Sequence, residues 1–417
     1  MLMKGCPPAG DDQVTLSNWQ EAPYNRWAFS HLRELVPTQR VRRAIGYTPA
    51  LPADYQPLGH LTVHRADGTE ASVDTVIADT YTDAVVVLHH GHVVMESYFG
   101  ETEFDTPHLL MSTTKSIVGC VAGNLVSQGL LSPERLVTDY VPELLESGYA
   151  NARVRDVLDM RSGVKFSEEY TDPEAEVRVM EQAFGWSPTT DGSVPGSIYD
   201  YLSTLKAKSD HGGAFDYRSC ETLALGWVCE RAAGKKMADL ISTLIWAPMG
   251  ADWDAELTCD SVGTGIHDGG LCTTARDLAR FGQVLLNDGK AVDGTQVVPS
   301  EWLRASWAVD PDIREAFDQS GNGEYLPAGW YRNQFWFLPR IHGDVLLCLG
   351  INGQMVYVNP GTATVGVKLS TWPDAQNGHM LHDAVRMFDV IGAELSGLAP
   401  ERARHDGPPG VAAGISR

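Results

Sequence analysis

A serine and a lysine stand three residues apart at the point where an apolar helical segment begins. In Ser112-x-x-Lys115 the first and last side chains share one helix face, about 5–6 Å apart at Cβ. A serine hydroxyl becomes an effective nucleophile only when a base removes its proton. We expect Lys115 to be that base, because burial and the positive end of the helix dipole both disfavour its ammonium form. The spacing therefore predicts nucleophilic catalysis by Ser112.

A second interpretation of this motif is a solvated helix start with Ser112 as its N-cap, since so short a pattern also recurs by chance. The surroundings favour catalysis. Residues 109–111 are apolar, and the helix that follows is apolar enough to be buried, where a surface lysine would be out of place. The start of this helix also leaves backbone N–H groups unpaired, and that of Ser112 can stabilise an oxyanion.

Two later segments could complete a site around this serine. Tyr217 precedes a helix expected at 220–233 and could carry a proton between nucleophile and leaving group. A half-buried tyrosine with a satisfied hydroxyl is the plainer interpretation. Residues 349–354 have the sequence Leu-Gly-Ile-Asn-Gly-Gln, and glycine at the end of a strand lets a ligand approach the backbone closely. An ordinary hairpin bend would explain the same glycines.

The elements that must position these groups predict an α+β fold. Strands are expected at 60–63, 71–76, 84–88, 93–98, 330–338, 344–349, 354–358 and 362–370. Helices are expected from Ser112 to Gly129 and at 153–160, 197–206, 220–233, 237–246, 274–286 and 379–396. A central antiparallel sheet built from both ends of the chain would be flanked by helices and would carry a mostly helical insertion. We expect a discontinuous α/β sheet domain at 16–131 and 250–396, a helical domain at 132–249, and flexible ends at 1–15 and 397–417.

The composition excludes several classes of function. Lys and Arg number 32 and Asp and Glu 54, so the 417 residues carry a formal charge of −22, which argues against nucleic acid and favours cationic small molecules. The seven cysteines are scattered without a C-x-x-C pair, so we expect neither a disulfide framework nor structural zinc. No secretory signal and no apolar run of bilayer length are visible. We therefore expect a cytoplasmic protein without membrane contact.

Neither a metal nor a cofactor is expected. His89-His90-Gly91-His92 could suggest a metal site, but three imidazoles in a hairpin turn cannot all face one ion. The sequence has no P-loop and no G-x-G-x-x-G dinucleotide motif. It also lacks the G-x-S-x-G motif of α/β-hydrolases, which leaves Ser112 as the candidate nucleophile.

In combination, Ser112-x-x-Lys115, Tyr217-x-Ser219 and the glycine-containing strand edge resemble the serine β-lactamase and penicillin-binding-protein superfamily, in its class C and carboxylesterase-like branch. Residues 155–163 and 269–280 are similar to further segments of that branch. Other segments resemble the members that hydrolyse 6-aminohexanoate dimers, which are linear nylon oligomers. These segments are 18–29, 81–84, 108–112, 169–173 and 372–374, and the similarity spans about 16–391.

The sequence departs from the superfamily pattern at two places. The third motif usually begins with lysine or histidine, whereas the corresponding stretch here is Cys348-Leu349-Gly350. Without that cation, binding of a carboxylate-bearing β-lactam is in doubt. The second motif ends in Ser219 where asparagine is frequent. Both departures fit the nylon-oligomer and esterase branch better than true β-lactamases.

The resemblance implies roles for individual residues. Ser112 would be the nucleophile, Lys115 its general base and Tyr217 the proton relay, and the backbone N–H groups of Ser112 and Ile351 would bind the oxyanion. Implied substrate contacts are Tyr170 on the scissile amide, Glu181 on a free ammonium and Asp268 as a second polar group. Trp186 and Trp336 could line the cleft, with core packing as the alternative.

The expected activity is that of a serine hydrolase that forms an acyl-enzyme. Its substrates would be amide bonds of small linear amino-acid oligomers and short-chain esters. Two alternatives stay open: a carboxylesterase of the same fold with little amidase activity, and a ligand-binding homologue that is acylated without turnover. Besides the small-molecule substrate, a second copy of the chain, in a homodimer, is the expected partner.

Overall fold

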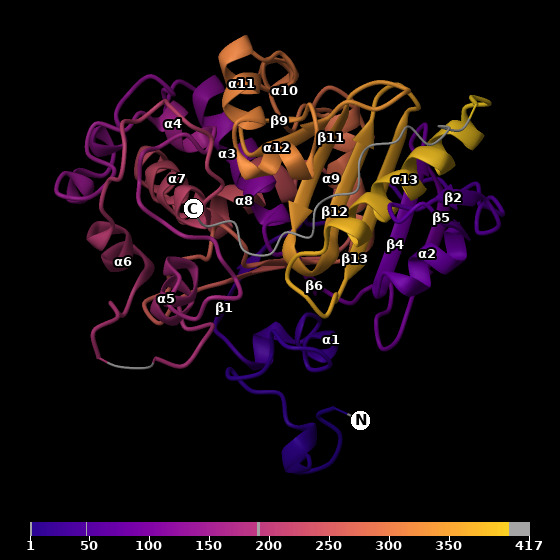
Figure 1. Cartoon of the computed structure of the whole chain (residues 1–417), viewed down its shortest axis with the longest axis horizontal. Helices are drawn as coiled ribbons and strands as arrows, with labels where there is room; N and C mark the ends of the chain where they lie inside the picture. Colours follow the sequence, from indigo (N-terminus) through magenta and orange to yellow (C-terminus); the bar gives the residue numbers. More distant parts are fainter. Residues whose placement is uncertain (1, 47, 190–191, 400–417) are drawn as a thin grey trace.

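The protein is built around a seven-stranded antiparallel sheet with the strand order β5-β4-β13-β12-β11-β10-β9 (Figure 1). The structure is a computed structural model that describes residues 2–46, 48–189 and 192–399. The expected flexible tail lies outside the described residues from residue 400 onward. The strands are β4 (Thr82–His89), β5 (His92–Tyr98), β9 (Trp330–Arg332), β10 (Phe335–Leu338), β11 (Val345–Gly350), β12 (Gln354–Asn359) and β13 (Thr364–Ser370).

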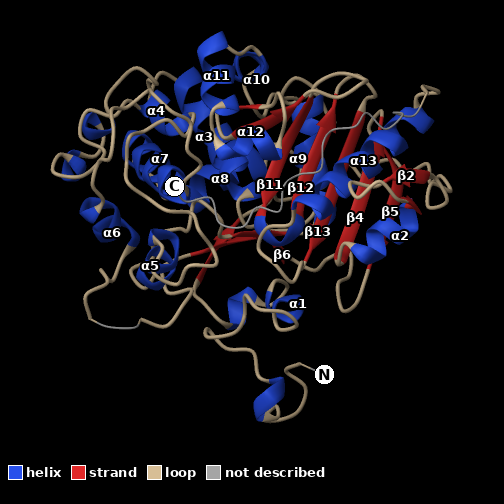
Figure 2. Cartoon of the chain, in the orientation of Figure 1, coloured by secondary structure: helices blue, strands red, loops and turns tan. Residues whose placement is uncertain are grey.

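Both faces of this sheet are covered by helices (Figure 2). Strand β4 shows why, because its residues alternate between two hydrophobic clusters. Val86 and Leu88 pack into the cluster that holds α9 (Ala275–Leu286), whereas Val85 and Val87 pack into the cluster that holds α13 (Gly378–Leu395). A continuous apolar strand is therefore buried on both sides, and the α+β class predicted from the sequence is confirmed.

Of the two smaller sheets, the four-stranded one was not apparent from the sequence pattern, whereas strands were expected close to the positions of the two-stranded one. A four-stranded sheet has the order β1-β7-β8-β6, with β1 (Thr38–Val41), β6 (His108–Leu109), β7 (Ala255–Thr258) and β8 (Leu271–Thr273). Strands of two to four residues are too short to show an alternating pattern. A two-stranded sheet pairs β2 (Thr62–His64) with β3 (Glu70–Ser72).

The strand predicted at 71–76 is wrong beyond residue 72. The chain turns into α2 (Val73–Asp79) there, because the Ser72 hydroxyl accepts a hydrogen bond from the Thr75 N–H at 3.1 Å and caps the helix. Val76 and Ile77 then reach the core at helical rather than strand spacing. The strand predicted at 330–338 is likewise split into β9 and β10 by a turn at 333–334.

Helices dominate the middle of the chain, on the opposite side of Figure 1 from the sheet. They are α4 (Val154–Leu158), α5 (Glu176–Ala183), α6 (Ile198–Thr204), α7 (Ser219–Ala233) and α8 (Met237–Ile241), which continues as a π-helix at Ser242–Trp246. Helix α5 was not predicted from the sequence. The domain boundaries proposed above stay a prediction.

Further short elements complete the fold. Outside the central helices they are α1 (Asn25–Ala28), α10 (Ser300–Trp307), α11 (Pro311–Asp318) and α12 (Gly321–Tyr325), with 3-10 turns at Gly10–Asp12, Leu32–Glu34, Val137–Asp139, Pro142–Leu144 and Ile351–Gly353. None of the helices in the described part of the chain is both long and apolar enough for a transmembrane span.

Helix α3 (Thr113–Ser127) lies between the sheet and the helical region and contacts both β11 and α7. Two glycines permit this close packing. A Cβ at Gly119 would lie 2.5 Å from the carbonyl oxygen of Asn333, and one at Gly123 would lie 2.5 Å from the ring of Trp302. The helix start is thereby held at the junction of the two parts, where the Ser112 motif stands.

Candidate active site

The nucleophile motif is at the N-terminus of α3, directly after β6. Ser112 is the N-cap residue, and Lys115 in the first turn is 1% exposed. The Lys115 Nζ lies 2.7 Å from the Ser112 Oγ, within hydrogen-bond distance. Met111 before the serine has φ +46°, a left-handed conformation that is rare for a residue with a long side chain and is typical of a constrained functional turn.

The Lys115 ammonium group has three acceptors. Besides Ser112 Oγ, its Nζ lies 3.0 Å from the Ser219 Oγ and 2.9 Å from the backbone oxygen of Asp268. The Asp268 carboxylate is 3.9 Å away. A lysine ammonium has three N–H donors and no acceptor, so this arrangement satisfies the charged form completely.

Burial alone predicts a lowered pKa for Lys115 and hence a neutral amine, and this prediction is wrong. Burial by itself lowers the pKa of Lys115, but Tyr217 and the carboxylates of Asp268 and Glu168 outweigh it and raise the pKa above its ordinary value. The lysine is therefore an ammonium in the free protein. It can act as a base only after it releases that proton.

Tyr217 lies beside this pair, immediately before α7. Its ring centroid is 5.2 Å from Lys115 Nζ and 4.9 Å from the ring of Trp336. Burial raises the pKa of Tyr217, while Lys115 acts in the opposite direction, so the phenol is neutral and can donate a proton. Arg218, 1% exposed, holds the segment in place by donating to the Val164 carbonyl at 2.5 Å.

The segments that carry the two predicted oxyanion donors lie against each other where β11 ends beside the turn before α3. Within the described part of the chain, the N–H groups of Ser112 and Ile351 have no backbone acceptor, so both can serve a ligand. Gly350 makes the approach possible. A Cβ there would lie 2.6 Å from the Leu110 carbonyl oxygen and 3.1 Å from the Met111 Cβ.

We expect Gly350→Ala to lower kcat/KM for a p-nitrophenyl ester by about 100-fold or more, the usual effect of losing one oxyanion donor. The added methyl group would push Ile351 away from Ser112. Gly196→Ala is the matched control, because its Cβ would meet nothing within 4 Å. Circular dichroism and thermal melting would show that both variants fold. Full activity of folded Gly350→Ala would exclude Ile351 as a donor.

A large cleft of about 1910 Å³ runs past these groups. Six of the predicted site residues line it: Ser112, Tyr217, Ile351, Tyr170, Glu181 and Trp336. Tyr170 precedes α5, Glu181 lies on that helix, and Trp336 lies on β10. The tertiary structure thus brings together residues from the sheet, the helical region and the turn before α3.

Two predicted substrate contacts are not among the described residues that line this cleft. Asp268 is buried at 6% exposure, and its backbone oxygen accepts a hydrogen bond from Lys115. Trp186 is 4% exposed and packs edge-on against both Trp19 and Phe184, at 5.2 Å between ring centroids in each case. For Trp186 the structure shows core packing, the alternative that its residue type left open.

The structure shows what stands in place of the lysine or histidine that usually begins the third motif. Cys348 is fully buried on β11, and its backbone oxygen accepts a hydrogen bond from the Thr113 hydroxyl at 3.3 Å. Leu349 and Gly350, which follow it, line the cleft. The strand edge beside Ser112 therefore presents apolar side chains and backbone groups in place of a cation.

Two charged residues of the site were missed from the sequence. Glu168 accepts hydrogen bonds from the Tyr170 hydroxyl at 2.7 Å and from the Ser219 N–H at 2.9 Å. Arg178 lies 2.8 Å from the Glu181 carboxylate and donates to the Tyr170 carbonyl oxygen at 2.8 Å. The i, i+3 spacing of Arg178 and Glu181 could have indicated their pairing, had a helix been predicted at this position.

The buried carboxylates of the site lie in surroundings that disfavour their charged form. Burial raises the pKa of Glu181, and Arg178 counteracts this shift. Burial likewise raises the pKa of Asp268, with Lys115 as the largest opposing influence. One carboxylate oxygen of Asp268, Oδ1, is buried without a hydrogen-bond partner among the described residues. The site therefore carries acidic groups whose charge is only partly compensated.

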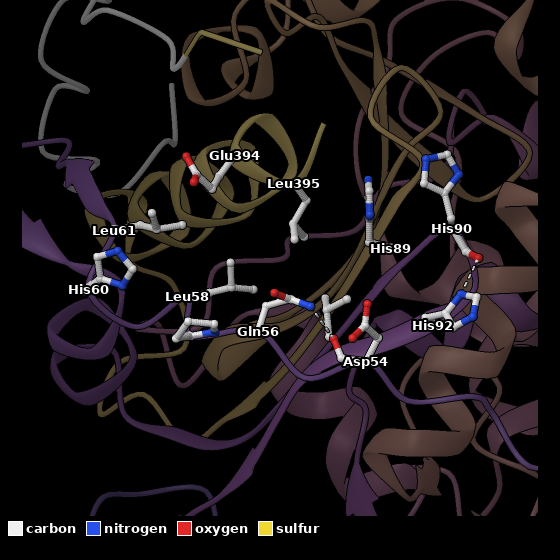
Figure 3. Close-up of a pocket in the computed structure, with 12 residues that line it drawn as sticks. Asp54, Gln56, Leu58, His60, Leu61, His89, His90, His92, Glu394 and Leu395 are labelled. Atoms are coloured by element: carbon white, nitrogen blue, oxygen red, sulfur yellow. Dashed lines mark hydrogen bonds between the residues drawn. The ribbon is translucent and has the colours of Figure 1, made fainter. Parts of the chain in front are cut away.

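A second pocket, of about 570 Å³, contains the histidine-rich turn (Figure 3). It lies between this turn, the segment near residue 56 and the end of α13, and His60, His89, His90 and His92 line it. The His92 ring nitrogen Nδ1 lies 3.2 Å from the His90 carbonyl oxygen. Across the described ranges, no three His, Cys, Asp or Glu side chains are grouped to hold a metal ion.

Known proteins resemble this chain in both sequence and structure. Residues 73–387 match the beta-lactamase family model. The chain is 39% identical over 396 residues to the 6-aminohexanoate-dimer hydrolase of Paenarthrobacter ureafaciens. The aligned region covers 92% of this chain and 97% of the relative. This identity confirms the relationship inferred from the sequence motifs.

Solved structures agree with the match. A Bacillus anthracis protein assigned to the 6-aminohexanoate-dimer hydrolases has a TM-score of 0.85 at 27% identity, over 94% of this chain and all of that one. A family VIII carboxylesterase shares the fold, with a TM-score of 0.58 at 15% identity over 78% of this chain and 96% of its own. The β-lactamase-like fold predicted from the sequence is thus confirmed, and the chain belongs to the beta-lactamase family of hydrolases.

Proposed function

We propose that the protein is a Ser-Lys-Tyr hydrolase that forms an acyl-enzyme on Ser112. Its substrates are amide bonds of small linear amino-acid oligomers, such as 6-aminohexanoate dimer, and short-chain esters. The observation that carries the proposal is the 2.7 Å contact between Lys115 Nζ and Ser112 Oγ, where Ser112 lines a large cleft and Tyr217 lies beside the pair. The named relative supports the choice of amide substrate.

Acylation begins after Lys115 has released its ammonium proton to solvent, and the neutral amine then accepts the proton of the Ser112 hydroxyl. The serine oxygen bonds to the carbonyl carbon, and the carbonyl electron pair moves to the oxygen, which the N–H groups of Ser112 and Ile351 stabilise. Tyr217 donates its proton to the leaving nitrogen as the carbon–nitrogen bond breaks, and it recovers a proton from Lys115. Water then attacks the ester carbonyl carbon, and its proton passes through Tyr217 and Lys115 to the Ser112 oxygen. The bond between that oxygen and the acyl carbon breaks, and the acid is released.

The cleft favours a substrate with a free amino group. The chain carries a formal charge of −22, and the cleft includes the carboxylate of Glu181. In our proposal this carboxylate binds the substrate ammonium and fixes the distance to Ser112. Arg178, at 2.8 Å, competes for the same carboxylate, so we expect the amine to share it rather than to hold it alone.

Amide and ester substrates should separate the roles of Tyr170 and Glu181. An amide nitrogen must be protonated to leave, whereas an activated ester needs no such help. We expect Tyr170→Phe and Glu181→Gln each to lower kcat/KM for 6-aminohexanoate dimer at least about 10-fold, with less than a threefold change on a p-nitrophenyl ester. Steady-state kinetics on both substrates would measure the difference.

Glu21→Gln is a suitable control for this comparison. Glu21 also lines the cleft, but its side chain is exposed, so the same charge change should leave both activities intact. Equal losses on both substrates in the Tyr170 and Glu181 variants would contradict the amine-specific cleft. The assignment as a hydrolase would then remain, without the specificity for amino-acid oligomers.

A carboxylesterase with little amidase activity is the second candidate, favoured by the shared fold of a family VIII carboxylesterase. A non-turnover binder is the third. Fluorophosphonate labelling of Ser112 combined with steady-state ester turnover separates them, since a binder would be labelled without turning over. The homodimer and the cytoplasmic location stay predictions, which sedimentation and cell fractionation would test.

A further inference from the structure

A carboxylate outside the Ser-Lys-Tyr group is embedded in the site. Glu168 is half-buried in the segment before α5 and lines the cleft. One of its oxygens, Oε1, accepts from the Ser219 hydroxyl at 2.5 Å and from the Tyr170 hydroxyl at 2.7 Å. The other, Oε2, accepts from the Ser219 N–H at 2.9 Å. Three donors thus converge on one charged acceptor, which is a strong arrangement.

These bonds continue to the catalytic lysine. Ser219 Oγ donates to Glu168 and accepts from Lys115 Nζ at 3.0 Å, so a single hydroxyl joins the lysine to the carboxylate. The path Lys115–Ser219–Glu168–Tyr170 is made of side chains from α3, α7 and the loop before α5. It connects the proposed base with the tyrosine proposed to contact the scissile amide.

A structural role alone explains this geometry poorly. Glu168 could have capped the start of α7 with one oxygen on the Ser219 N–H, and its second oxygen would then have been free for solvent. Instead that oxygen binds two hydroxyls that lead in opposite directions, one toward Lys115 and one toward Tyr170. Arg178 also contacts the Tyr170 ring, with its guanidinium carbon 5.5 Å from the ring centroid.

We propose that Glu168 is a positioning residue that, through Ser219, couples Tyr170 to the Ser112–Lys115 pair. This inference rests on the proposed hydrolase function and extends it. Glu168 keeps the Tyr170 hydroxyl aimed at the leaving group. Its negative charge also holds a proton on Lys115 in the free enzyme.

The charge effect has a definite sign. The groups that face Lys115 are Tyr217, Asp268, Glu168 and the hydroxyls of Ser112 and Ser219. Burial lowers the pKa of Lys115, while Tyr217, Asp268 and Glu168 raise it. Removing the charge of Glu168 therefore lowers that pKa. Because acylation needs the neutral amine, the acid limb of the pH profile must move to lower pH.

Glu168→Gln removes the charge and cannot accept all three hydrogen bonds, since its amide nitrogen is a donor. The matched control is Glu169→Gln. Glu169 is the next residue, is also half-buried and lines the cleft, but within the described residues its side chain accepts hydrogen bonds from Thr171, through the N–H and hydroxyl of that residue, and not from Ser219 or Tyr170. Glu168→Asp keeps the charge and tests rescue.

Two measurements separate the roles. The first is the pH dependence of acylation by a fluorophosphonate probe and of p-nitrophenyl ester hydrolysis. Glu168→Gln should move the acid limb of both to lower pH by about half a pH unit or more, whereas Glu168→Asp and Glu169→Gln should leave it near the wild-type position. A merely structural defect would lower the rate at every pH without moving the limb.

The second measurement is a double-mutant cycle with Tyr170→Phe on 6-aminohexanoate dimer. Each single variant should lower kcat at least about 10-fold with a smaller change in KM, and the double variant should be no worse than Tyr170→Phe by more than about threefold. Additive losses, or a limb that does not move in Glu168→Gln, would overturn the inference while the hydrolase stands. If wild type is neither labelled nor active, the proposed function fails and the inference falls with it.

Discussion

Replacing Ser112 by alanine is expected to lower kcat/KM for ester hydrolysis by about three orders of magnitude or more, the scale found when a serine nucleophile is removed. The reason is chemical, because no acyl-enzyme can form without the hydroxyl. Ser112 contacts Lys115 at 2.7 Å and lines the cleft, and its N–H has no backbone acceptor among the described residues. Steady-state hydrolysis of p-nitrophenyl acetate and butyrate would measure the loss.

The control for this variant lies on the same helix. Ser127, the last residue of α3, is exposed, so Ser127→Ala should keep wild-type activity. Fluorophosphonate labelling should disappear in Ser112→Ala and persist in Ser127→Ala. If folded Ser112→Ala kept most of its activity, the nucleophile would be another residue and the Ser-Lys-Tyr assignment would be wrong.

Lys115→Arg should also be almost inactive, with a loss of about three orders of magnitude. A guanidinium stays protonated at any working pH and cannot accept the serine proton. It is also larger than the ammonium that fits between Ser112, Ser219 and Asp268 in a fully buried site. The same kinetic assay, together with the rate of fluorophosphonate labelling, would measure the effect on acylation.

Because a buried arginine could disturb folding, Lys115→Ala provides a second variant. The truncated side chain leaves room for a small primary amine from solution to take the place of the lost one. Partial recovery of activity with added methylamine, rising with pH, would support a base role. Substantial activity of Lys115→Arg without rescue would show that another group deprotonates Ser112.

The catalytic motif could be predicted from the sequence because its geometry is local. An i, i+3 pair on a helix meets whatever the rest of the fold does, so Ser112 and Lys115 lie together as expected. The same holds for the β4–β5 hairpin and for helices α7, α9 and α13, whose periodic patterns matched the structure to within a few residues. The family relationship also came from short motifs and was confirmed over 92% of the chain.

Other features depend on residues that are distant in sequence. The approach of Gly350 to the Leu110 carbonyl oxygen joins segments some 240 positions apart, and no periodicity encodes it. Likewise the residue type of Trp186 left both a cleft position and core packing open, and its contact with Trp19 places it in the core. Short strands such as β6 form only because their neighbours in space supply the hydrogen bonds.

The charge of Lys115 shows this division most clearly. The sequence by itself determined that a lysine would face Ser112 in a buried helix, and burial alone implied a neutral amine. Only the tertiary structure decided that Glu168 and Asp268, from two separate loops, would lie close enough to keep it an ammonium. Hydrogen-bond geometry within one helix turn is set by the local backbone, whereas electrostatic interactions act through space and depend on every chain segment that the fold brings near.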